Sequence, residues 1–128
     1  RWIEPPWKMI LSNKAILPIL WELFPDHPNL LRASLTPFSD TFVSKPILAR
    51  EGANVTIMLD GLIVARSDGD YDGTRVYQEF HPLPDFGGRH PVLGGWVVRG
   101  QACGMGIRED DGPITRNGSR FIPHAFTE

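Results

Sequence analysis

The chain has 128 residues, a length typical of one domain, and its 41% hydrophobic and 22% charged residues are close to globular averages, which excludes a wholly disordered protein. A net charge of −2 and the lack of any basic run argue against a dedicated nucleic-acid-binding protein, although they leave room for a single phosphate site. No apolar stretch approaches the roughly 18 residues that a membrane-spanning helix needs, so no membrane partner is expected.

The cysteine content and the first residues bear on location. Cys103 is the only cysteine, which excludes an internal disulfide framework and is typical of the reducing cytoplasm. The first residues lack the charged-then-apolar pattern of a secretory leader, so we expect a cytoplasmic location. The sequence starts at Arg1 rather than at a methionine, which predicts an excerpt of a longer protein.

One helix and several strands are predicted along the chain. Residues 1–7 are proline-rich and expected to be extended, after which Ser12 and Asn13 offer a helix cap. The apolar residues that follow recur at helical spacing until the proline-rich stop at 25–29, which predicts a helix. The remaining segments with strand composition are 42–49, 54–59, 62–66, 75–80, 91–99 and 102–108.

Two hairpin turns connect these strands. Asp60 and Gly61 between two apolar runs are a strong hairpin signal, and Gly100 with Gln101 is a weaker one. Short strands joined by hairpins, with few helices, predict an α+β fold with a mostly antiparallel sheet.

The segment around Lys45 is the most informative for function. A lysine among apolar strand residues indicates a bound anion, because buried lysines are rarely found without a partner. The adjoining turn contains Gly52, and backbone N–H groups of this turn could bind the same anion. About 25 residues later, residues 76–84 read as a strand that runs into a proline-stopped connector. Together these features predict a nucleotide-binding clamp.

These segments resemble, in order and across nearly the whole chain, the C-terminal ATP-grasp ligase domain of the glutathionylspermidine synthase family. Any one match would be weak, whereas the ordered set is specific. The matching stretches are Trp2-Ile3-Glu4-Pro5-Pro6-Trp7, Ser12-Asn13-Lys14-Ala15-Ile16-Leu17, Phe24-Pro25-Asp26-His27-Pro28-Asn29-Leu30-Leu31, Lys45-Pro46 with Arg50-Glu51-Gly52-Ala53-Asn54, Gln78-Glu79-Phe80-His81-Pro82-Leu83-Pro84, Gly106-Ile107-Arg108-Glu109-Asp110, and Ser119-Arg120-Phe121-Ile122-Pro123-His124.

The resemblance implies an ATP-grasp-like fold and an ATP-dependent carboxylate–amine ligase. In such enzymes ATP phosphorylates a carboxylate, and an amine attacks the acyl phosphate to form an amide. The family implies ATP and magnesium as cofactors, a carboxylate such as glutathione and an amine such as spermidine. The identity of both substrates stays open, because relatives differ in them.

The resemblance also assigns nucleotide-binding residues. Lys45 is expected to contact the ATP phosphates, and a charge-assisted bond of roughly 1.5–3 kcal/mol predicts a ten- to hundredfold loss of affinity on its removal. Lys14 is expected to be the second phosphate-contacting lysine, with Lys8 as the competing candidate. The adenine is expected at Gln78, Glu79, Phe80 and His81.

Two arginines and a loop complete the expected site. Arg50 and Arg108 resemble the arginines that face the transferring phosphoryl group and the carboxylate, a task suited to a planar and permanently charged guanidinium. For Arg108 the alternative is a hairpin-end ion pair with Glu109 or Asp110. Residues 51–54, which include Glu51 and Gly52, are expected to form a mobile lid over the phosphates.

A calcium-loop pattern at 68–79 is a weaker candidate. Asp68, Asp70, Asp72 and Gly73, with Glu79 at the final position, match the spacing of an EF-hand loop. That motif requires a helix on each side, whereas strands are predicted here, so a solvated acidic loop is favoured.

The magnesium ligands that the family implies have no clear equivalent in these residues. We therefore predict that residues 1–128 are part of a ligase domain, inactive alone, with no metal site of its own and with the ligands upstream. Trp2, Trp7 and Trp21 are expected to be exposed where the missing part would pack, which favours self-association. The alternative is a non-catalytic nucleotide-binding or interaction module that retains the fold.

Overall fold

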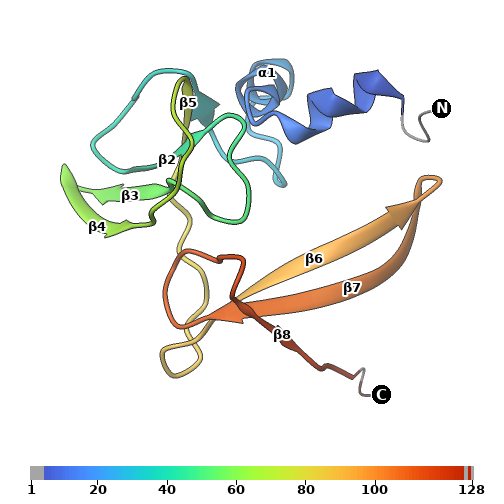
Figure 1. The fold of residues 1–128 in the computed structure, drawn as a ribbon. Helices are drawn as coiled ribbons and strands as arrows, with labels where there is room; N and C mark the ends of the chain where they lie inside the picture. Colours follow the sequence, from blue (N-terminus) through green and yellow to red (C-terminus); the bar gives the residue numbers. More distant parts are fainter. Residues whose placement is uncertain (1–4, 126, 128) are drawn as a thin grey trace. The chain divides into compact units, whose positions relative to one another are not determined.

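The computed structural model describes residues 5–125 and 127 and divides into two compact units, Arg1–His81 and Pro82–Glu128 (Figure 1). The antiparallel sheets and few helices confirm the predicted α+β class. Among the described residues, no helix has the length and apolar character needed to cross a bilayer.

Unit 1 begins with two short helices. Pro6–Ser12 forms a 3-10 helix, labelled η1, and Ile16–Leu23 forms α1. The expectation that Ser12 or Asn13 caps the predicted helix was wrong, because the N-cap of α1 is Ala15 and no side chain caps it. Asn13 Oδ1 instead accepts a hydrogen bond of 2.9 Å from the Ala15 N–H in the turn that precedes α1. The expectation of an extended start was wrong for Pro6 and Trp7, because proline suits the first turn of a helix, where its missing N–H costs little. Residues 1–4 lie outside the described part of the chain.

A five-stranded antiparallel sheet forms the body of unit 1. Its strands are β1 (Ala33–Ser34), β2 (Phe42–Pro46), β3 (Thr56–Leu59), β4 (Leu62–Arg66) and β5 (Arg75–Gln78), in the spatial order β1-β5-β2-β3-β4. The predicted turn between β3 and β4 is confirmed by Asp60 and Gly61, both of which have positive φ (49° and 76°), as type I′ hairpins require.

Residues that share a face of this sheet can be read from its register, because directly paired residues point to the same side. Lys45 pairs with Val76, and Val43 pairs with both Gln78 and Ile57, so all of them lie on one face. Val76 and Ile57 are buried there. On the opposite face Phe42 packs edge-on against Tyr77, with ring centroids 5.2 Å apart. Lys45 is thus placed beside the apolar centre of unit 1.

Unit 2 is a three-stranded antiparallel sheet in the order β6-β7-β8, formed by His90–Val98, Gln101–Asp110 and Arg120–Ile122. The β6–β7 turn is made by Arg99 and Gly100, with φ of 50° and 78°, one residue earlier than predicted. The buried residues in the described part of this unit are Asp110 and Ser119, both polar. Unit 2 therefore has no apolar core among its described residues.

Candidate functional site

The centre of the candidate site is Lys45, in the fourth position of β2. Its Nζ donates a hydrogen bond of 2.8 Å to Oε1 of Gln78, which lies across the sheet on β5. The structure thus brings together two residues that the sequence predicted for the nucleotide site. Because Gln78 uses its carbonyl oxygen here, its amide N–H groups can still donate to a ligand.

Lys14 connects the start of α1 to the turn that follows β2. Its backbone N–H donates to the Ile47 carbonyl (2.8 Å), and its Nζ donates to the Ala49 carbonyl. Arg50 follows directly and is exposed. Lys14, which was expected to make the second phosphate contact, therefore lies in the same part of unit 1 as Lys45 and Arg50.

These three cations influence one another electrostatically. Burial lowers the pKa of Lys45, and the positive charge of Lys14 lowers it further. Burial and the charge of Arg50 likewise lower the pKa of Lys14. The oxygens that the two lysines bind are neutral, one from a carbonyl and one from an amide. A bound anion would stabilise the charged forms of these two lysines, and the anion-binding role of the cluster stays a prediction.

Glu51 and Gly52 lie in the turn that directly follows Arg50. Both have positive φ (52° and 71°), and the neighbouring Ala53 N–H donates to the Arg50 carbonyl (3.0 Å). The far half of the turn is anchored: Ser67 Oγ donates to the Gly52 carbonyl (2.5 Å), and Asn54 Nδ2 donates to the Gly69 carbonyl (2.9 Å). The predicted closing of this loop over phosphates stays a prediction.

Arg75, the first residue of β5, supports the site and was missed in the sequence. Its Nε donates to Ser44 Oγ (2.6 Å), and its Nη2 donates to the carbonyls of Ser44 (3.2 Å) and Asn54 (2.6 Å). Arg75 therefore connects the strand that carries Lys45 to the loop that carries Glu51 and Gly52. The one available signal was a charged residue at the head of an otherwise uncharged strand.

The stretch predicted to bind adenine leaves the sheet after Gln78. Glu79 is paired with Arg32 in both directions: its N–H donates to the Arg32 carbonyl (2.8 Å), and its carboxylate accepts from the Arg32 N–H (3.4 Å). Glu79 and Phe80 line a cleft of about 630 Å³ within unit 1, whereas His81 is exposed at the end of that unit. The other residues that line the cleft are Trp21, Asp26, Arg32, Phe38, Ser39 and Thr41.

Arg108 lies on β7 and so belongs to unit 2, whereas Arg50 belongs to unit 1. Its Nη2 donates to the carbonyls of Arg116 and of Asn117, the latter at 3.3 Å. Its guanidinium carbon lies 5.4 Å from the centre of the Phe121 ring, within the range of a cation–π interaction. The joint action of Arg50 and Arg108 on one substrate stays a prediction.

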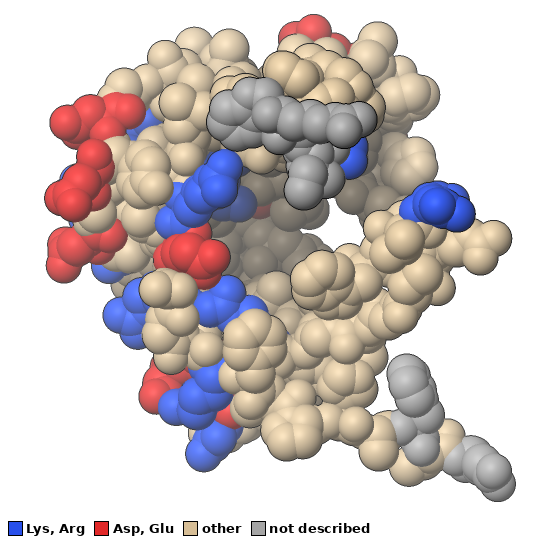
Figure 2. Space-filling model, turned by 45° about the vertical axis from the view of Figure 1, so that its right-hand side comes forward, with Lys and Arg blue, Asp and Glu red and all other residues tan. Residues whose placement is uncertain are grey.

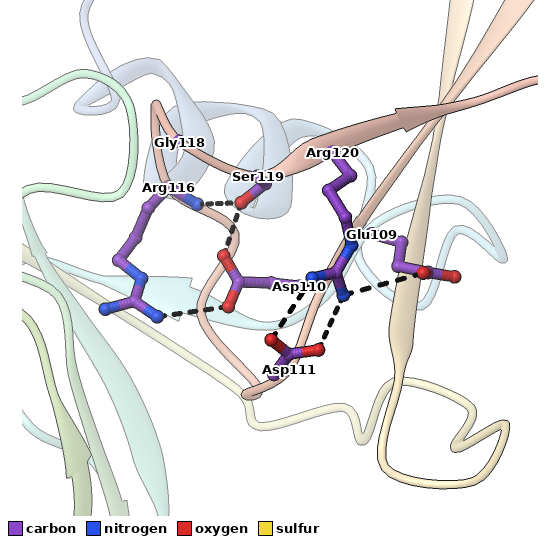
Figure 3. A pocket seen from close by; sticks show the side chains of 7 residues that line it. All are labelled: Glu109, Asp110, Asp111, Arg116, Gly118, Ser119 and Arg120. Atoms are coloured by element: carbon purple, nitrogen blue, oxygen red, sulfur yellow. Dashed lines mark hydrogen bonds and ion pairs between the residues drawn. The ribbon is translucent and has the colours of Figure 1, made fainter.

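The carboxylates weighed as partners of Arg108 form a separate cluster (Figure 3). Asp110 binds Arg116 Nη2 (3.1 Å) through one oxygen and Ser119 Oγ (2.5 Å) through the other. Arg120 binds Asp111 (2.5 Å) and approaches Glu109 (3.6 Å). Together with Gly118 these residues line a hollow of about 370 Å³. The charged groups of this cluster pair with one another, and their ion pairs and hydrogen bonds connect the end of β7 to the start of β8.

Asp110 gives the cluster a measurable pH dependence. The hydrogen bonds from Arg116 and Ser119 lower its pKa from 3.8 to about 2. A carboxylate with a lowered pKa stabilises the fold fully above its unfolded pKa, and that contribution disappears as the pH falls through the folded value. We expect Asp110→Asn to lower the free energy of unfolding at pH 7 by about 1–3 kcal/mol, since it breaks a buried hydrogen-bonded charge.

Urea unfolding at pH 7 and at decreasing pH measures this effect. The difference between Asp110→Asn and the wild type should shrink as the pH approaches 2. The exposed Asp111 is the matched control, and Asp111→Asn should change stability much less, because exposed ion pairs contribute little. Equal effects of the two substitutions would contradict the assignment.

The calcium-loop pattern lies between β4 and β5, so strands rather than helices flank it. Its backbone is hydrogen-bonded to the turn before β3, where Asn54 Oδ1 accepts from the Tyr71 N–H (2.9 Å). The structure thus supports the acidic-loop interpretation. Within the described ranges, no group of three or more His, Cys, Asp or Glu side chains is placed to hold a metal.

A family model described as glutathionylspermidine synthase preATP-grasp matches residues 1–127. The chain belongs to the glutathionylspermidine synthase family. The matching description is preATP-grasp, whereas the sequence had suggested the C-terminal ATP-grasp domain, so the family is confirmed and the ATP-grasp assignment is not.

Relatives of this family member are ligases. The chain is 46% identical over 138 residues to a putative acid–amine ligase of Haemophilus influenzae, and the match covers 98% of the chain and 35% of the relative. It is 41% identical to the trypanothione synthetase of Crithidia fasciculata (94% of the chain, 19% of the relative). It is 31% identical to the bifunctional glutathionylspermidine synthetase/amidase of Escherichia coli (94% and 20%). The chain thus spans about a third or less of the length of these relatives.

Proposed function

We propose that this chain supplies ATP-binding and phosphoryl-transfer residues to an ATP-dependent carboxylate–amine ligase. The observation that carries the proposal is the cluster of Lys14, Lys45 and Arg50 in unit 1, in which two lysines with lowered pKa values are bound only by neutral oxygens in the described contacts. Triphosphate oxygens would supply the negative charge that this cluster lacks.

In the proposed reaction the carboxylate attacks the γ-phosphorus of ATP, ADP leaves, and an acyl phosphate forms. The amine then attacks the acyl carbon and expels phosphate, which leaves an amide. Lys45 and Lys14 hold phosphate oxygens. The amide group of Gln78 and the backbone of residues 79–81 hold the adenine. Arg50 and Arg108 neutralise charge on the transferring phosphoryl group and on the carboxylate. Glu51 and Gly52 close over the phosphates.

The names of the relatives support the substrate classes. An acid such as glutathione and an amine such as spermidine are the substrates that those names indicate. The family also implies magnesium, but the described residues offer no cluster of metal ligands. We therefore place the metal ligands outside these residues and expect the isolated chain to bind ATP without forming an amide.

A calorimetric titration of ATP into the 128-residue chain, with and without magnesium, tests the proposal. We expect saturable binding of ATP, weaker binding of AMP and no amide product when glutathione and spermidine are added. A folded chain to which neither ATP nor tripolyphosphate binds would contradict the assignment. The second candidate, a non-catalytic nucleotide-binding module, predicts the same binding but no ligase activity even in a longer protein that contains the complete domain.

A further inference from the structure

The β6–β7 hairpin contains glycines that its own fold does not require. Gly94 and Gly106 are directly paired in the middle of the two strands, and neither has a φ in the left-handed region. A Cβ built on Gly106 meets no atom within 4 Å, and one built on Gly94 meets only a backbone oxygen at 3.7 Å. A glycine inside a strand is destabilising relative to alanine. Such a glycine often marks a place where another backbone approaches closely.

Large exposed side chains border these glycines on the same face of the sheet. Trp96 lies two residues from Gly94, and Phe121 pairs with Arg108, which is two residues from Gly106. Trp96 is 69% exposed and Phe121 is 76% exposed. The same face also carries Arg108, whose guanidinium lies against the Phe121 ring. The face thus combines a directly paired set of glycines with two largely exposed aromatic side chains, which is unusual for a protein surface exposed to water.

The edge of the same hairpin is also unprotected. β6 is the outer strand of its sheet, and no residue from Pro91 to Val98 carries a charge. The β6–β7 arm accordingly appears in Figure 2 as tan surface along most of its length. Soluble proteins usually protect a long edge strand with charges or cover it with another segment. Unit 2 also has no buried apolar residue among those described, so this face is where its missing core would form.

We infer that the face formed by Gly94, Gly106, Trp96 and Phe121 is the docking surface for a polypeptide segment from the remainder of the synthetase. The length of the relatives supports this occupant: the Haemophilus relative matches over 98% of the present chain, yet the match covers only 35% of its own length. Most of that relative therefore lies outside the matched part. Glycine allows the backbone of such a segment to pack directly on the sheet, and the two aromatic side chains bury against its flanks.

The test compares two settings for one substitution. In the isolated 128-residue chain, Gly106→Val should leave the melting temperature unchanged or raise it, because the added side chain meets open space on a strand that favours valine. In a chimera, the full-length Haemophilus ligase carries this chain in place of its matched third. There the same substitution should lower the melting temperature by about 5 °C or more, because the valine collides with the docked segment.

Gly112→Val is the matched control, since Gly112 also has open space around it but lies in the connection after β7. It should have little effect in either setting. If Gly106→Val prevents the chimera from accumulating, Gly106→Ala should give a smaller loss in the same direction.

Three results would overturn the inference. In the first, Gly106→Val leaves the chimera unchanged, so that nothing covers the face. In the second, it destabilises the isolated chain equally, so that the cover comes from within the chain. In the third, the isolated chain forms a defined dimer that the substitution dissociates, which would assign the face to a second copy. None of these measurements uses ATP, so their failure is distinct from failure of the nucleotide proposal.

Discussion

Lys45→Met is expected to lower ATP affinity about ten- to a hundredfold, because it removes a charge-assisted bond to phosphate worth roughly 1.5–3 kcal/mol. The same change should not reduce the stability of the ligand-free chain. The pKa of Lys45 is lowered by burial and by Lys14, which means that the fold disfavours the charged form. A lysine that served only structure would show the opposite pattern, with lost stability and unchanged binding.

The sign of the pH dependence follows from the same shift. Bound phosphate raises the pKa of Lys45 back towards its ordinary value, so binding takes up a proton once the pH exceeds the lowered pKa of the free chain. ATP affinity of the wild type should therefore fall as the pH rises through that value, and Lys45→Met should flatten the dependence. Calorimetry in buffers of different ionisation enthalpy measures the proton uptake. Arg66→Met is the control, because Arg66 is exposed on the edge strand β4 and should affect neither quantity.

The exposed apolar surface bears on the expected self-association. Trp7 is 61% exposed, as predicted, whereas Trp21 is only partly exposed and lines the cleft of unit 1, and Trp2 lies outside the described residues. In addition, η1 and α1 expose Met9, Leu11 and Leu23. Apolar surface of this extent favours association with another polypeptide. Whether the isolated chain associates with itself stays a prediction.

Most of the strands could be predicted because each carries its own signal. β3 and β4 are two apolar runs around Asp60 and Gly61, and that pattern needs no knowledge of distant residues. β1 and β8 were missed because they are only two and three residues long. Each exists because a longer strand, β5 or β7, provides a partner. No local pattern can reveal a strand that is defined by its neighbour.

In the candidate site, too, local features could be predicted from the sequence, whereas contacts between distant residues could not. Lys45 could be selected because a charged residue in an apolar strand is a local anomaly. Its bond to Gln78 joins residues 33 positions apart and required the register of β2 against β5. The contribution of Arg75 was hidden for the same reason, since its acceptors lie 31 and 21 positions away. Family resemblance supplied roles for single residues but not the contacts between them.

Arg75→Met is expected to destabilise unit 1 by about 3 kcal/mol. The substitution removes three hydrogen bonds from a charged donor, and the carbonyls of Ser44 and Asn54 lose their guanidinium partner. Ser44 is buried, so water replaces that partner poorly. Because Arg75 holds the strand of Lys45 against the loop of Glu51 and Gly52, ATP affinity should also fall, although Arg75 itself touches no phosphate in the proposed site.

Urea unfolding and ATP titration of the same variant separate the two effects. Arg75→Lys should recover part of the stability, since an ammonium can replace one of the bonds but not the fork that spans Ser44 and Asn54. If Arg75 acts only by positioning the loop, the affinity lost in Arg75→Met should be partly recovered in Arg75→Lys, in step with stability. Affinity that falls equally in both variants, while Arg75→Lys regains stability, would instead place the Arg75 guanidinium in contact with the nucleotide.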